Sequence, residues 1–320
     1  MLAVAALAMP FFGLIFLGFA CGKIMRYPEA GLQWMNFFIV YLALPALFIK
    51  LIAPTPLEEL ANWAFVLSTT ACTFVVFALS FVLGRIITGE GVRTATMQAV
   101  AGAYSNIGYM GPGLTLAALG QNAIIPTALI FVFDSILLFT LVPLLMAFGS
   151  PQKTSLPSTL LQIVRRIVTH PFNIATAVAV VMAYFRFVPP GPIDTMITFL
   201  KNAAAPCALF TMGVTVALRP LRSMPADLPA LLAVKMVLHP VLVWLVLSTV
   251  GGFQREWIFT AVLMAALPPA LNVFVLANQY KVFVERASTA ILAGTLISVF
   301  TVTGLLYLIA NDLIPFDPLH

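Results

Sequence analysis

The chain has 320 residues, of which 62% are hydrophobic and 8% are charged, and its mean hydropathy is +1.06. Roughly a quarter of the residues of a soluble domain are charged, so this composition excludes a water-soluble protein. The net charge of +5 comes from basic residues that stand singly between apolar runs, which excludes the clustered basic face of a nucleic-acid-binding protein.

Ten apolar runs of roughly 20 residues, the length that crosses the hydrocarbon core of a bilayer, follow one another along the chain. They comprise residues 2–22, 32–52, 62–84, 94–120, 123–148, 169–187, 193–218, 226–250, 257–280 and 284–310. Lipid offers no partner to unpaired backbone groups, so runs of this length predict helices. We therefore expect an all-α integral membrane protein with ten transmembrane helices.

The fourth and ninth runs carry helix breakers near their middle. Three glycines and Pro112 fall within six residues of the fourth run, and Pro268 and Pro269 adjoin in the ninth. Proline removes a backbone donor and clashes with the preceding turn, so we expect both helices to be broken there. Broken helices at corresponding places in two halves of a chain are typical of the substrate site of a secondary transporter.

The halves of the chain share motifs at a constant spacing. Met9-Pro10-Phe11-Phe12 recurs as His170-Pro171-Phe172-Asn173, and Leu44-Pro45-Ala46-Leu47-Phe48 recurs as Pro206-Cys207-Ala208-Leu209-Phe210 with the same offset between prolines. Five helices per half is an odd number, so the second repeat is inverted relative to the first. We predict a first repeat at residues 1–148, a cytoplasmic linker at 149–168, a second repeat at 169–310 and a short outward-facing tail at 311–320.

Basic residues mark the cytoplasmic side of the predicted helices. The loops after the odd-numbered runs hold Lys23, Arg26, Arg85, Arg93, Lys153, Arg165, Arg166, Arg219, Arg222, Lys281 and Arg286, whereas the opposite side has only Lys50, Arg186 and Arg255. This bias predicts that both termini face outward, on the side of the membrane opposite the cytoplasm. Cys21, Cys72 and Cys207 lie in apolar runs without metal-type spacing, so we expect neither a metal nor a cofactor.

Several motifs resemble the auxin efflux carrier family, and within it the bacterial members regarded as malonate carriers. They are residues 106–112 (Asn-Ile-Gly-Tyr-Met-Gly-Pro), 205–210 (Ala-Pro-Cys-Ala-Leu-Phe), Leu267-Pro268, 275–280 (Val-Leu-Ala-Asn-Gln-Tyr) and Ala287-Ser288-Thr289. The resemblance covers essentially the whole chain. It implies two inverted five-helix repeats whose fourth and ninth helices cross, with a small organic anion bound at the crossing near Asn106 and Pro45. The resemblance is also compatible with a homodimer.

The chemistry of such a crossing suits a carboxylate, because half-helix N-termini expose unpaired N–H groups and a partial positive charge. Asn106 and Asn272 can donate amide hydrogens to a carboxylate. Substrate binding is the favoured role of Asn106 because it adjoins a helix break, whereas Asn272 can equally join helices to each other; packing is the favoured role of Tyr109. The predicted substrate-binding residues are Pro45, Ser105, Asn106, Gly108, Tyr109, Gly111, Pro112, Pro206, Pro268, Pro269 and Asn272.

Asp134 stands near the middle of the fifth run, where an ionised carboxylate costs at least a few kcal/mol. It is a candidate for proton coupling, and a structural aspartate bonded to a neighbouring helix is the alternative. Lys235 is expected to extend its amine to the interface. It is also a candidate for pairing with Asp134 or for attracting an anion. His170 is expected to be solvated at the cytoplasmic end of the sixth helix.

ATP-binding and common hydrolase motifs are absent from the sequence, so an enzyme is not expected. The prediction is a secondary transporter that moves small organic carboxylates, malonate-like or auxin-like, across the lipid bilayer by alternating access. The alternatives are a sodium- or proton-coupled carrier of another organic acid on the same fold, and a channel-like or sensory membrane protein.

Overall fold

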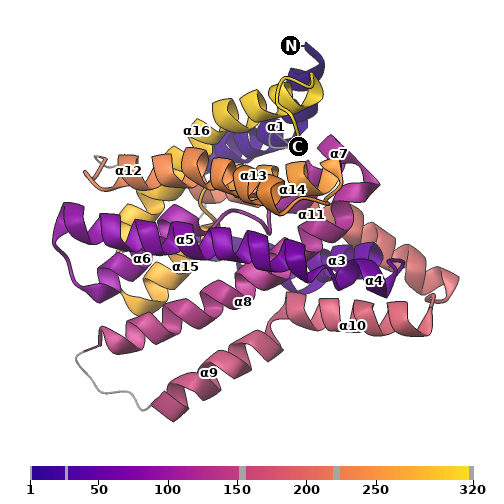
Figure 1. Cartoon of the computed structure of the whole chain (residues 1–320), viewed down its shortest axis with the longest axis horizontal. Coiled ribbons are helices and arrows are strands. Elements are labelled where there is room, and N and C mark those ends of the chain that lie inside the picture. The colour runs from indigo at the N-terminus through magenta and orange to yellow at the C-terminus, as the bar shows by residue number, and fades with distance from the viewer. Residues whose placement is uncertain (1, 26–27, 151–155, 219–223, 317–320) are drawn as a thin grey trace.

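The computed structural model describes residues 2–25, 28–150, 156–218 and 224–316 (Figure 1). The helices of the first half are α1 (Leu2–Met25), α2 (Gln33–Phe38), α3 (Leu44–Ile52), α4 (Leu57–Leu60), α5 (Trp63–Thr88), α6 (Val92–Ala103), α7 (Gly111–Leu119) and α8 (Ile124–Phe148). Those of the second half are α9 (Leu156–Thr169), α10 (Pro171–Phe185), α11 (Gly191–Ala217), α12 (Leu228–Ala233), α13 (His239–Val250), α14 (Arg255–Ala266), α15 (Leu271–Tyr280) and α16 (Val284–Ala310).

Short helical segments of other pitch complete these elements. Two π-helical segments, η2 (Ile39–Ala43) and η4 (Val234–Leu238), join α2 to α3 and α12 to α13 without interrupting the helical path. The 3-10 segments η1 (Glu29–Leu32) and η3 (Gln121–Ala123) precede α2 and α8.

Part of the predicted linker is helical, since residues 156–168 belong to α9. Some predictions fall outside the described residues: linker positions 151–155, tail positions 317–320, and the predicted cytoplasmic residues Arg26, Lys153, Arg219 and Arg222.

The helices confirm an all-helical membrane protein. Among the described residues, six helical stretches are long and apolar enough to cross a bilayer: Ala30–Ile52, Trp63–Thr88, Gln121–Phe148, Gly191–Ala217, Leu228–Val250 and Val284–Ala310. A seventh span arises if Pro157–Thr169 and Pro171–Phe185, which meet at 55°, are counted together. The predicted fourth and ninth helices are absent from this set because each consists of two short helices, α6 with α7 and α14 with α15.

Helix α5 shows how the bundle sorts its side chains. Leu67 and Ile86 are 66% and 74% exposed, whereas Thr73 and Ser80 are 2% and 0% exposed. Apolar side chains thus point outward, as lipid requires, and hydroxyl groups point inward. The Thr73 hydroxyl finds a partner on another helix, since it donates to Asp134 of α8 at 3.1 Å.

The packing falls into two groups of helices. In one group α1 packs along α11, and α3 packs against both α10 and α11. In the other group α5, α6, α8 and α12 to α16 pack among themselves, while α7 contacts α8 and α14. Each group takes helices from both halves of the chain, and Figure 1 shows α15 beside α6 although the two are distant in sequence.

Glycine allows the closest helix contact in the first group. A Cβ atom added to Gly18 of α1 would lie 2.1 Å from the Phe210 carbonyl oxygen of α11, and one added to Gly213 would lie 2.0 Å from the Ile15 carbonyl oxygen. The contact is reciprocal, with one glycine on each helix against the backbone of the other. Small residues of this kind let transmembrane helices associate through backbone contact.

This contact predicts that Gly213→Ala lowers the thermal unfolding temperature of the detergent-solubilised protein, because the new methyl group forces α1 away from α11. Gly304→Ala in α16 is the matched control, since its added Cβ meets nothing within 4 Å. The control should be neutral or stabilising by up to about 1 kcal/mol, the difference in helix propensity between the two residues. Equal unfolding temperatures for both variants would contradict the role of the glycine contact.

Candidate functional site

The two predicted breaks are present and meet each other. The chain leaves α6 at Tyr104 and leaves α14 at Leu267 in extended conformation. The Asn106 N–H donates to the Pro268 carbonyl at 2.8 Å, and the Ala270 N–H donates to the Tyr104 carbonyl at 3.0 Å. Together the bonds form an antiparallel bridge between two interrupted helices. Backbone groups released by each break are thereby satisfied by the other, as burial inside a membrane protein requires.

The breakers act mainly as structural residues of this crossing. Pro268 and Pro269 form the extended strand that crosses residues 104–106, and Gly111 and Pro112 are buried in the first turn of α7. A Cβ on Gly111 would lie 2.7 Å from the Met264 sulfur, so a larger residue there would require the Met264 side chain of α14 to shift.

Beside the crossing lies a cavity of about 70 Å³. Of the predicted substrate-binding residues, it brings together Ser105, Asn106, Gly108, Tyr109 and Asn272. Its apolar wall includes Val40, Phe131, Phe172 and Leu271. Helices α7 and α15 both begin next to it, so the positive ends of two helix dipoles lie near the same small space.

The other predicted residues do not line this cavity. Pro45 lies in the first turn of α3, directly after η2, and Pro206 is an exposed residue inside α11. The motif around Pro206 still lies close to the crossing, because a Cβ added to Gly113 of α7 would meet the Ala205 side chain at 3.0 Å.

Amide and hydroxyl groups in the cavity wall have weak partners or none. The Asn106 amide donates to the Met212 sulfur at 3.0 Å, and its oxygen accepts the Tyr109 N–H at 3.4 Å. The Asn272 amide donates to the Tyr104 hydroxyl at 3.3 Å. The buried Ser105 hydroxyl has no hydrogen-bond partner among the described residues. Thioether sulfur is a weak acceptor, so an arriving carboxylate can replace it at little cost.

Asp134 lies on the other side of Ser105. The Thr73 hydroxyl donates to one Asp134 carboxyl oxygen at 3.1 Å and also lies 3.5 Å from Nε2 of His239. The second carboxyl oxygen has no hydrogen-bond partner among the described residues. A cavity of about 10 Å³ separates Asp134 from Ser105, which therefore borders this cavity and the larger one.

Lys235 does not extend to the interface, so that prediction is wrong. Its side chain is completely buried, and its Nζ donates to the carbonyl of Ala265 in the last turn of α14. The break at Leu267 leaves the last carbonyls of α14 without helical partners, and an amine at this helix end satisfies one of them. Lys235 forms no ion pair with Asp134 within the described ranges.

His170, expected to be solvated, is a cavity residue that sequence reasoning missed. It stands at the N-cap of α10, and its ring lies between Phe139 and Phe172, with centroid distances of 4.9 and 5.0 Å. The sequence placed it at a helix end, but only the packing of α10 against α8 shows that this end faces the crossing.

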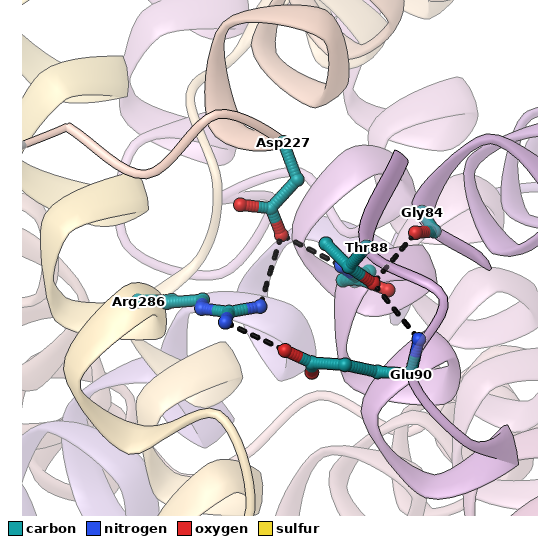
Figure 2. Close-up of polar contacts among 6 residues, drawn as sticks. Gly84, Thr88, Glu90, Asp227 and Arg286 are labelled. Carbon is teal, nitrogen blue, oxygen red and sulfur yellow. Dashed lines mark hydrogen bonds and ion pairs between the residues drawn. The ribbon is translucent and has the colours of Figure 1, made fainter. Parts of the chain in front are cut away.

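A separate polar network joins the two halves of the chain, as Figure 2 shows. Arg286 at the start of α16 donates to Glu90 at 2.7 Å and lies 3.6 Å from the buried carboxylate of Asp227. Asp227 also accepts the Gln98 amide at 2.7 Å, and Gln98 reaches Thr88 at 3.4 Å. The network thus connects the region around the α5–α6 turn to the starts of α12 and α16.

Comparison with known proteins agrees with this architecture. A family described as membrane transport proteins matches residues 4–306. The chain belongs to this family. It is 51% identical over 317 residues, 99% of both chains, to a protein of Rhizobium meliloti (strain 1021) named "Putative malonate transporter".

More distant relatives of this membrane transport protein match in part. An "Uncharacterized transporter" of Methanothermobacter thermautotrophicus is 27% identical over 62% of this chain and 63% of its own. "Auxin efflux carrier component 1" of Arabidopsis thaliana is 28% identical over 47% of this chain and 25% of the plant protein. These matches confirm the resemblance to auxin efflux carriers and the expectation of a membrane transporter that is not an enzyme.

The Arg286 network predicts a specific pattern of stability. Arg286→Met should lower the thermal unfolding temperature, because the buried Asp227 loses its cation. Adding Asp227→Asn should recover part of that loss, so the two changes should be non-additive in a double-mutant cycle. Arg85→Met, at an exposed position near the end of α5, is the control and should change little. Strictly additive losses would contradict the pairing.

Proposed function

We propose that this protein is a secondary transporter of small organic carboxylates of the malonate class, with its substrate site at the crossing of the two broken helices. The observation that carries the proposal is a polar cavity, inside an otherwise apolar bundle, at which two half-helices begin. The name of the Rhizobium meliloti relative supports the same substrate class.

Carboxylate binding here needs no positively charged contact. The amides of Asn106 and Asn272, the unpartnered hydroxyl of Ser105 and the half-helix N-termini all offer hydrogen-bond donors. The cavity is small: pockets for drug-sized ligands enclose roughly 300–1,000 Å³, against about 70 Å³ here. This size favours a short aliphatic acid over an aromatic acid such as auxin.

For the membrane arrangement we infer ten crossings in two inverted five-helix repeats, with both termini in the periplasm of a bacterial inner membrane. The paired breaks and the two packing groups, each drawn from both halves, support the repeat. The distribution of Lys and Arg supports the orientation. Alternating access would then move one group of helices relative to the other around the crossing.

We infer that Asp134 couples transport to protons. Its carboxyl is nearly fully buried, has one oxygen without a hydrogen-bond partner among the described residues, and shares a small cavity with Ser105 of the substrate site. Binding an anion beside Ser105 makes a second negative charge at Asp134 less favourable, so substrate binding and protonation support each other.

The first test is uptake of labelled malonate into proteoliposomes at an imposed inside-positive potential. Asn106→Ala should reduce saturable uptake by roughly tenfold or more, because a hydrogen bond to a charged group is lost. Asn311→Ala changes an exposed asparagine at the end of α16 and should transport like wild type. Wild-type flux without saturation or counterflow would instead indicate a channel. Unchanged uptake by the Asn106 variant would refute the site.

A second test concerns the pH dependence of the same uptake. Asp134→Asn removes the titrating carboxyl while keeping a similar shape, so the rate should no longer vary with pH through this group. Asp194→Asn is the matched control, since Asp194 pairs with Lys50 at 2.7 Å, away from the cavity, and should leave the pH profile unchanged. A wild-type pH profile in the Asp134 variant would rule out the coupling role.

A further inference from the structure

We propose that His170 binds the second carboxylate of the substrate, and that this contact makes the site selective for dicarboxylates over monocarboxylates. The inference rests on the proposed function, because it assigns a second pole to the same cavity. The first pole consists of the amide and hydroxyl donors at the crossing, Ser105, Asn106 and Asn272.

The imidazole of His170, like the Ser105 hydroxyl, is a polar group of the cavity wall without a hydrogen-bond partner among the described residues. Within the described ranges no hydrogen bond reaches either ring nitrogen, and Nδ1 is buried without a partner. An imidazole with a purely structural role in a membrane bundle normally finds a hydrogen-bond partner, since an unpaired polar group is costly there. We therefore infer that the imidazole of His170 donates a hydrogen bond to a ligand in the cavity.

The ring is also held in place. Phe139 of α8 and Phe172 of α10 flank it, with centroid distances of 4.9 and 5.0 Å. Phe172 in turn packs edge to face on Phe131, another cavity residue, at 4.7 Å. This aromatic cluster limits the rotation of the imidazole, so it is positioned before the anion arrives.

The surroundings suit a negative charge. No Asp or Glu lines the cavity among the described residues. His170 is the N-cap of the 15-residue helix α10, whose positive dipole end adds to the attraction. The same cavity is also lined by Val40, Phe131 and Leu271, whose apolar side chains suit the methylene carbon of a short diacid.

A monocarboxylate can satisfy the crossing donors but leaves His170 without a partner. A short dicarboxylate reaches both poles. A site built with a polar group discriminates against the ligand that leaves this group unpaired, which is a stronger effect than the presence or absence of a methylene group. The histidine therefore sets selectivity between acids, while the crossing residues are needed for every acid.

The experiment compares labelled malonate with labelled propionate, a monocarboxylate with the same number of carbons, in saturable proteoliposome uptake. We expect His170→Gln and His170→Phe to lower the ratio of malonate to propionate transport by about tenfold or more, mainly through loss of malonate. Tyr184→Phe, which removes a hydroxyl from the exposed far end of α10, is the control and should keep the wild-type ratio.

Malonate-induced thermal stabilisation of the detergent-solubilised variants gives a second reading that does not depend on reconstitution. A His170 variant that has the wild-type unfolding temperature without ligand is correctly folded. Malonate should no longer stabilise such a variant. An unchanged ratio, or an equal loss for both acids, would overturn the role of His170. Failure of the proposed function has a different signature: Asn106→Ala would then transport both acids like wild type.

Discussion

The pairing of two broken helices through their backbones is the constraint on which the rest of the structure depends. Inside a membrane, neither break is tolerable alone, because its free carbonyl and amide groups would have no partner. Placed against each other, the breaks exchange hydrogen bonds between residues 104–106 and 268–270. The same arrangement leaves four helix ends beside one point, and a cavity with hydrogen-bond donors is the direct result.

The polar residues near the crossing divide between holding it together and serving a ligand. Lys235 belongs to the first kind, since its amine satisfies a carbonyl at the end of α14. We propose the second role for Ser105 and His170, because their side chains border the cavity without a partner of their own among the described residues. Asn106 stands between them: it contacts backbone and a thioether, and neither contact is strong.

The helix breaks can be predicted from the local sequence, whereas the directions in which individual side chains point cannot. The glycine and proline cluster at 108–113 and the adjacent Pro268 and Pro269 predict interrupted helices from sequence alone. A single proline is not enough, since Pro206 lies inside the continuous helix α11. The burial of Lys235 depends on which way α12 and η4 face α14, and the place of His170 depends on how α10 packs against α8. Neither position can be deduced from the residues next to it in the chain. The expectations that a lone lysine extends to the interface and that a histidine at a helix end is solvated were therefore wrong.

The two π-helical segments give the bundle a means of changing register. A π turn contains one residue more than an α turn, and such turns are costly unless the structure uses them. If η4 changed from π to α geometry, its extra residue would have to move into the neighbouring helix. The helix before η4 would then rotate by about 100° relative to the helix after it. Lys235 would then leave the end of α14, and η2, which carries Val40 into the cavity wall, has the same property. Such a change at either π segment would rotate part of a helix by a little over a quarter of a turn, without any hinge in the loops.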